Sequence, residues 1–159
     1  MKVENVTRDD WIIGGLALLL VLDLLFLPWF SVGGTITIGT ATVSVGGSLT
    51  ATDAPDAWLG VLGVLATVLV IVDLGIERFS PQTQLPVIGE SRAVTRLVLV
   101  IAAAVFLALK FLFQIGHFSD LGFGFWAAVV LMAGLLYFAV QARNADPVAT
   151  ARPAGPSTP

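Results

Sequence analysis

Four long apolar segments, separated by short polar stretches, dominate the hydrophobic pattern of the chain. They cover about residues 11–30, 58–76, 94–115 and 121–140. Each is close to the roughly 20 residues that an α-helix needs to cross a hydrocarbon core about 30 Å thick. Because lipid offers no partner for backbone amides, such segments cross as helices and not as open strands. The pattern predicts an all-α membrane protein, a bundle of four transmembrane helices.

The stretch between the first two apolar segments follows a shorter period. In "TITIGTATVS", Thr35 to Ser44, polar and apolar residues alternate and β-branched side chains are frequent, a pattern typical of paired strands. A two-residue turn at Gly39-Thr40 has glycine first, as a type II′ turn prefers. We therefore expect a small β-hairpin at about residues 35–45, and the run Ser48 to Thr52 could add a third strand.

The register that follows from this turn separates two kinds of side chain. Ile36 lies opposite Val43, and Ile38 extends the same apolar face, while the hydroxyl side chains lie on the other face. An isolated hairpin is marginal in water, so the apolar face needs a cover. Two alternatives could cover this face. The hairpin could lie on the helix ends as a lid, or it could bind a partner. Ile36, Ile38 and Val43 are therefore candidates for partner binding.

The lysines and arginines are distributed unevenly over the loops. Seven of the eight lie in or beside three stretches: the start of the chain, the link between the second and third segments, and the end of the chain. They are Lys2, Arg8, Arg78, Arg92, Arg96, Arg143 and Arg152. The loops at residues 31–57 and 116–120 contain none. The positive-inside rule then predicts a multi-pass protein of the cell membrane, with both termini cytoplasmic and the hairpin outside.

Aromatic residues near the segment ends fit this topology. Trp and Tyr are enriched at membrane–water interfaces, where their rings are half in lipid and half in water. We expect an inner belt at Trp11 and Tyr137 and an outer belt at Trp29, Trp58 and Trp126.

Three ionisable residues lie deep in the apolar segments, namely Asp23, Asp73 and Lys110, and Arg96 lies at the start of the third segment. A charge at the centre of a membrane helix costs about 2.5–3.5 kcal/mol on insertion scales, so such residues pair or meet water. A rise of about 1.5 Å per residue places Asp23 level with Lys110, and Asp73 level with Arg96. We expect two intramembrane ion pairs, Asp23–Lys110 and Asp73–Arg96. The alternative makes Asp23 the protonatable carboxylate of a transporter.

Residue types that carry catalysis are scarce. The chain has no cysteine and one histidine, His117, which shares the predicted outer side with Asp53, Asp56 and Asp120. Together these four could bind a divalent metal. However, Asp56 and Asp120 each precede an apolar helical run, where an acid caps a helix N-terminus. The motifs for a nucleophile elbow, a phosphate-binding loop or haem ligation do not occur. We therefore expect no enzyme, no metal site and no cofactor.

The composition of the chain also indicates which surroundings and partners to expect. Hydrophobic residues make up 57% of the chain and charged residues 12%, with a net charge of −3 and no basic patch, so nucleic acid is not expected as a partner. Membrane lipid is the expected surrounding. Residues 146–159 are proline-rich and polar and predict a disordered cytoplasmic tail.

The motif "LPWF", Leu27-Pro28-Trp29-Phe30, is followed by a loop rich in glycine, threonine and serine that leads to "DAWLGVLGVL". With these features the chain resembles a family of uncharacterised four-span membrane proteins of high-GC, actinobacterial-type bacteria. The excess of arginine over lysine suits such a genome. The outline is also similar to that of claudin-like tetraspan proteins, but only in architecture, because the paired cysteines and the Gly-Leu-Trp stretch of that group are missing. The resemblance implies a fold and no activity.

These observations lead to two functional hypotheses. The first is a non-enzymatic integral membrane protein, an accessory or assembly subunit of a larger membrane complex, whose partners are other membrane subunits or a second copy. The alternative is a small proton- or cation-coupled transporter that uses Asp23.

Overall fold

A computed structural model describes residues 8–80, 88 and 91–145. The protein is mostly helical, with four long helices and one small antiparallel sheet. In chain order the elements are α1 (Arg8–Phe26), β1 (Phe30–Ile38), β2 (Ala41–Leu49), α2 (Ala57–Phe79), α3 (Arg92–Phe113), the short 3-10 helix η2 (Ile115–Asp120) and α4 (Phe123–Ala145).

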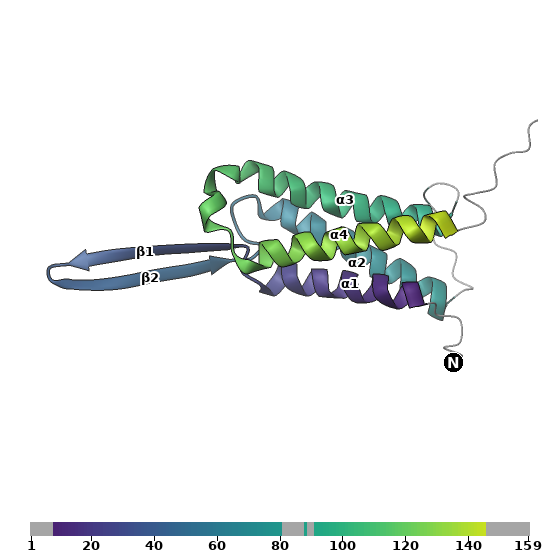
Figure 1. The fold of residues 1–159 in the computed structure, drawn as a ribbon, viewed down its shortest axis with the longest axis horizontal. Coiled ribbons are helices and arrows are strands. Elements are labelled where there is room, and N and C mark those ends of the chain that lie inside the picture. Colours follow the sequence, from purple (N-terminus) through teal and green to yellow (C-terminus); the bar gives the residue numbers. More distant parts are fainter. Residues whose placement is uncertain (1–7, 81–87, 89–90, 146–159) are drawn as a thin grey trace, which may run out of the picture.

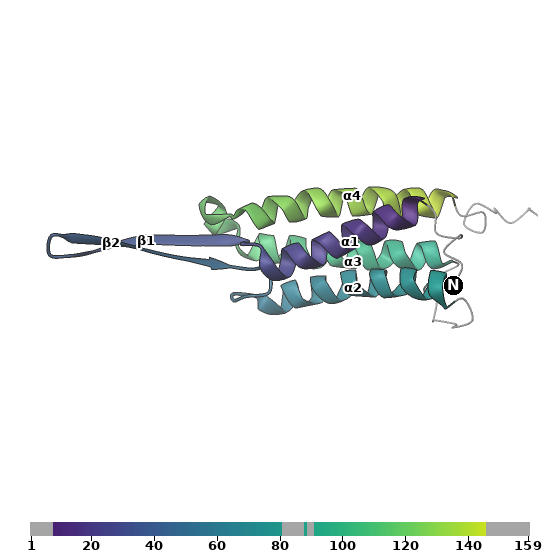
Figure 2. The ribbon, with the colours of Figure 1, turned by 90° about the horizontal axis from the view of Figure 1, so that it is seen from below.

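The four long helices lie side by side with their axes roughly aligned (Figures 1 and 2). α1 packs against α2 and α4, and α3 packs against the same two helices, so α1 and α3 lie diagonally opposite each other. Each helix contributes fully buried aliphatic side chains to the core, among them Leu20, Leu24, Val70, Val100 and Leu135.

Three of the helices, α2, α3 and α4, are long and apolar enough to cross a membrane. α1 is also apolar and 19 residues long, but it carries Asp9, Asp10 and Asp23 and is therefore more charged than the others. The expected disordered tail, residues 146–159, and most of the link at residues 81–90 lie outside the described residues.

α1 ends at Phe26, four residues before the end of the apolar segment that predicts it. Its helical pattern ends with the bond from the Leu27 amide to the Asp23 carbonyl, 2.9 Å, and Phe30 already belongs to β1. The reason is Pro28, because the residue before a proline is disfavoured in the α conformation. The Trp29 amide instead donates to the Leu49 carbonyl at 2.8 Å, so the chain turns from helix to strand within three residues.

The start of α4 holds this turn in place. The Gly122 and Gly124 amides donate to the Trp29 and Pro28 carbonyls at 2.8 and 2.9 Å, which satisfies amides that a helix N-terminus leaves free. A Cβ at Gly122 would lie 2.2 Å from the Pro28 oxygen, so the approach requires glycine. α4 therefore begins at Phe123, two residues later than the apolar pattern predicts.

Neither aspartate expected to cap a helix does so through its side chain. Asp56 occupies the N-cap position of α2, but its backbone is left-handed, with φ 57° and ψ 34°, and its side chain forms no cap hydrogen bond. Asp120 ends η2, three residues before α4 begins, so it is too far from the α4 amides that it was expected to cap.

The sheet has the predicted register. β1 and β2 pair antiparallel about a turn at Gly39-Thr40, with Ile36 opposite Val43. Gly39 has φ +65°, the left-handed region that glycine adopts without strain. The strands are longer than expected, nine residues each. The run from Ser48 does not start a third strand, because β2 continues through it to Leu49.

The hairpin extends away from the helices along the long axis of the molecule (Figure 1). Ile36, Ile38 and Val43 are exposed, with Ile38 at 72%, so the hairpin does not cover the helix ends as a lid. The direction is set at the base of the hairpin, where the Trp29–Leu49 bond and an antiparallel bridge between Phe30 and Leu121 attach it to the helices. We call this end of the molecule the hairpin end.

Candidate functional site

The hairpin presents two chemically different faces. Its apolar face carries Ile36, Ile38, Ala41, Val43 and Val45, all exposed. Its opposite face carries hydroxyl side chains, among them Thr35, Thr37, Thr42 and Ser44. Because successive side chains of a strand point to opposite faces, the paired Phe30 and Leu49 at the base belong to the apolar face. Both pack into the core, so one apolar strip runs from the core to the turn.

A buried lysine anchors the loop between β2 and α2. Lys110 is 1% exposed, and its Nζ donates to the carbonyls of Asp53 and Pro55 at 3.1 and 2.9 Å. Gln114, one turn further along α3, donates from Nε2 to the same Pro55 carbonyl at 2.9 Å. These contacts attach the loop between β2 and α2 to the end of α3 beside the hairpin.

The expected ion pair between Asp23 and Lys110 is not formed. The lysine reaches backbone carbonyls instead, and Asp23 accepts a long hydrogen bond, 3.5 Å, from Trp29 Nε1. The two residues do lie near the same end of their helices, as expected. However, α1 and α3 are diagonal in the arrangement, so equal depth does not bring the side chains together.

Asp23 is left with an unusual environment. It is 2% exposed, and its Oδ1 atom has no hydrogen-bond partner among the described residues. Trp29, its one side-chain donor in that part of the chain, is also buried, so it does not belong to an aromatic belt as expected. A buried polar atom without a partner is costly, which makes Asp23 a candidate for a functional role.

A pocket of about 360 Å³ opens at the foot of the hairpin. We call it the base pocket, and its walls are Phe30, Leu49, Pro55, Asp56, Phe113, Gln114 and Asp120. It therefore combines apolar walls with two carboxylates. Ser119 Oγ donates to Asp120 Oδ1 at 3.1 Å, and neither Asp56 nor Asp120 forms a salt bridge with a lysine or arginine that the structure describes.

The loop beside the base pocket has its own internal support. The Thr50 amide and hydroxyl donate to Asp53 Oδ2 at 2.7 and 2.9 Å. These two hydrogen bonds hold the pKa of the Asp53 carboxyl below its ordinary value, because they stabilise the charged form. The Asp53 carboxylate therefore stabilises the loop itself and does not line the base pocket.

The opposite end of the helices, which we call the arginine end, holds a network of ion pairs. The expected pair is present, with Arg96 Nε 2.9 Å from Asp73 Oδ2. Arg96 also pairs with Glu77 and, at 3.8 Å, with Asp10 on α1. Arg78 Nη2 lies 2.5 Å from Asp10 Oδ2, which joins α1 to α2.

Sequence reasoning missed most of this network. It considered only charges inside the apolar segments, so it passed over Asp10, Glu77 and Arg78 at their ends. A signal was present: Glu77 follows Asp73 by four residues, and Arg96 follows Arg92 by four, so each pair occupies one face of its helix. Arg92 Nη1 lies 3.8 Å from Asp73 Oδ1, which completes the link between the two faces.

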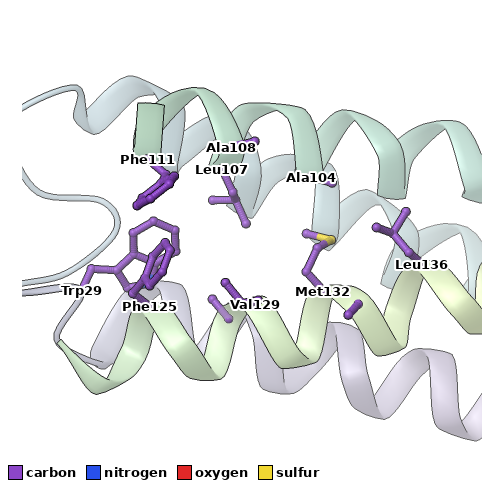
Figure 3. A pocket seen from close by; sticks show the side chains of 11 residues that line it. Trp29, Ala104, Leu107, Ala108, Phe111, Phe125, Val129, Met132 and Leu136 are labelled. Atoms are coloured by element: carbon purple, nitrogen blue, oxygen red, sulfur yellow. The ribbon is translucent and has the colours of Figure 1, made fainter. Parts of the chain in front are cut away.

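An apolar groove of about 380 Å³ runs between α3 and α4 (Figure 3). Three aromatic rings gather at its hairpin end: Trp29 meets Phe125 edge to face at 5.5 Å, and Phe125 stacks on Phe111 at 4.9 Å. The remaining lining is aliphatic, including Leu107 and Met132. Such a groove offers only van der Waals contact, for example to an acyl chain.

The possible metal set of His117, Asp53, Asp56 and Asp120 is not resolved as a site, since the His117 side chain lies outside the described part of the chain. Within residues 8–80, 88 and 91–145, no three histidine, cysteine or acidic side chains group closely enough to hold a metal ion.

The fold defines a helical protein with three apolar helices suited to crossing a membrane, which is consistent with a membrane protein. Comparison with protein-family models, with curated proteins and with solved structures finds no match. The resemblance that rests on Leu27-Pro28-Trp29-Phe30 therefore stays a prediction.

Proposed function

We propose that this chain is a non-enzymatic, multi-pass protein of the cell membrane. In this proposal it serves as an accessory or assembly subunit of a larger membrane complex. The hairpin carries the proposal. Its strands of nine residues reach about 30 Å, at roughly 3.3 Å per residue, and expose Ile36, Ile38 and Val43 to solvent. Two strands alone are marginally stable in water, so a partner that covers the apolar face would stabilise them.

The proposal includes α1 as a fourth membrane span. Its 19 residues reach about 28 Å at 1.5 Å per residue, close to the thickness of a hydrocarbon core. Whether the acidic residues of α1 prevent it from crossing a membrane depends on which way their side chains point. Asp10 and Asp23 are turned into the protein, and Asp9 is exposed in the first turn. Beyond that turn the exposed side of α1 is apolar, including Leu18, Leu22 and Phe26. α1 would therefore present hydrocarbon to lipid despite its acids.

The distribution of cations supports an orientation. Arg78, Arg92, Arg96 and Arg143 all gather at the arginine end. Under the positive-inside rule this end, with both termini, faces the cytoplasm and the hairpin end faces outward.

The exposed aromatic residues support the same placement. Trp11 and Tyr137 lie toward the arginine end, and Trp58 and Trp126 lie toward the hairpin end, each at least half exposed. Two such belts are expected where a helical protein meets the two lipid interfaces.

A role without catalysis fits how the buried charges are used. Asp73 and Arg96 pair with each other, and Lys110 binds backbone carbonyls, so these groups hold elements together. Catalysis needs several polar groups that converge on a substrate, and the apolar groove between α3 and α4 offers none.

The test is to disrupt the apolar face and observe the native complex. We expect the wild type to migrate as a complex larger than the monomer in gently solubilised native membranes. Ile36→Ser combined with Val43→Ser should release the monomer, because the partner would lose its apolar contact. The matched control is Thr37→Ser with Thr42→Ser on the opposite face, which should leave the complex intact. A wild type that migrates as a monomer in native membranes would contradict the proposal.

A small proton- or cation-coupled transporter is the second candidate, and one observation favours it. Asp23 is buried with an unpartnered Oδ1, and Lys110, the expected counter-cation, is engaged elsewhere. Asp23→Asn in proteoliposomes should then abolish coupled transport and leave the fold intact. Under the accessory-subunit proposal, wild type and Asp23→Asn should both show only background flux.

A further inference from the structure

We propose that the apolar face of the hairpin and the base pocket form one docking surface for a segment of a different protein. That segment would place apolar side chains on the hairpin and a basic side chain, Lys or Arg, in the base pocket between Asp56 and Asp120. This inference rests on the proposed function and specifies the chemistry of the partner.

The first step is the charge of the base pocket. Asp56 and Asp120 both line it, and neither forms a salt bridge with a described lysine or arginine. Lys110 interacts electrostatically with Asp53 and Asp56. However, its ammonium is buried and donates to two backbone carbonyls, so it cannot also enter the pocket. The two carboxylates thus give the base pocket an acidic site beside the apolar side chains of Phe30, Leu49 and Phe113.

The second step is continuity. Phe30 and Leu49 are walls of the base pocket and also the lowest pair of the apolar strip on the hairpin. A segment that lies along Ile36 and Val43 therefore leads directly to the carboxylates of the pocket. The surface accordingly fits a chain that carries apolar residues followed by a cation.

The third step excludes a second copy as the occupant. The loops at the hairpin end, residues 31–57 and 116–120, contain three aspartates and no lysine or arginine. Two copies meeting through this surface would bring like charges together, which opposes association. Anionic lipid head groups are repelled for the same reason, so a chain of opposite charge is the fitting occupant.

The experiment uses the full chain in its native membranes. A photoreactive p-benzoylphenylalanine replaces Ile38, and the crosslinked product is identified by mass spectrometry. We expect a covalent adduct with one different protein. The combined variant Asp56→Asn and Asp120→Asn should lower the adduct yield about tenfold, because a partly buried charge pair loses its acid partner. The matched control Asp9→Asn, an exposed acid at the arginine end, should leave the yield unchanged.

Ionic strength provides a second measurement that needs no variant of the pocket. Raising salt from 0.05 to 0.5 M should lower the wild-type adduct yield, since exposed charges are screened within about 10 Å at 0.1 M. If the double variant fails to fold, this salt dependence decides the question.

The outcomes separate the two proposals. If an adduct with a different protein forms and its yield changes neither in the double variant nor with salt, the proposed basic side chain in the base pocket is wrong. The accessory role is then still supported. An adduct with a second copy, or with lipid alone, overturns the docking surface described here. The absence of any adduct overturns both this inference and the proposed function.

Discussion

Arg96 contacts three carboxylates, those of Asp10, Asp73 and Glu77, and so joins α1, α2 and α3 through one side chain. Its ion pair with Asp10 spans the diagonal from α3 to α1. The guanidinium suits this position because its five donors lie in a rigid fork and remain charged when buried.

Replacing Arg96 should be severe. Arg96→Met removes the cation that Asp10, Asp73 and Glu77 share, and among the described residues it leaves Asp73 with only the 3.8 Å contact to Arg92. We expect the free energy of unfolding to fall by about 3–5 kcal/mol. Thermal or denaturant unfolding in detergent measures this loss. Arg143→Met, an exposed arginine at the same end, is the control and should change stability little. A variant Arg96→Met as stable as the control would mean that the network contributes nothing to the fold.

Asp23 and Lys110 provide a second prediction, because their side chains bind different groups. Lys110→Met should cost about 1–3 kcal/mol, since the Asp53 carbonyl loses the Lys110 donor and the Pro55 carbonyl keeps the donor on Gln114. A double-mutant cycle with Asp23→Asn should give a coupling energy below about 0.5 kcal/mol, as for residues without contact. A coupling well above 1 kcal/mol, with each single variant rescued by the other, would restore the ion pair expected from depth alone.

At the scale of elements, two helical glycines have opposite surroundings. In α2, a Cβ at Gly60 would lie 1.8 Å from the Ala51 carbonyl oxygen, so the loop after β2 packs directly on the helix. In α1, a Cβ at Gly15 would meet nothing within 4 Å. The glycine in α2 therefore serves packing, and the glycine in α1 does not.

The two alanine variants should differ in sign. Gly60→Ala forces the loop off α2 and should destabilise the protein by about 1–3 kcal/mol, as overpacking does. Gly15→Ala should be neutral or stabilising by up to about 1 kcal/mol, because alanine favours the helix. Unfolding midpoints measured side by side test both, and equal shifts would contradict the close approach at Gly60.

At the scale of the whole molecule, the orientation can be measured because the chain contains no cysteine. A single cysteine at Thr37→Cys on the hairpin should react with a membrane-impermeant maleimide in intact cells. A cysteine at Ile88→Cys, an exposed position between α2 and α3, should react only after permeabilisation. The opposite pattern would reverse the proposed topology.

Local patterns determined a large part of this molecule. The period of two from Thr35 to Ser44 and the turn at Gly39 together specified the hairpin register residue by residue, because the turn sets the pairing and the alternation separates the apolar face from the hydroxyl face. The apolar segments located all four helices to within a few residues. The helix ends were predicted less accurately. At Phe26, for example, Pro28 and the hydrogen bond from the Gly122 amide determine where α1 ends, and hydrophobicity does not.

Tertiary structure decided which of the two expected ion pairs forms and where the hairpin points. The depth of Asp23 and Lys110 follows from sequence, but the diagonal placement of α1 and α3 separates them, and helix neighbours depend on packing between distant segments. The hairpin could have folded back as a lid by its pattern. Its attachment at Leu49 and Leu121 directs it away from the helices, and those bonds join residues far apart in the chain.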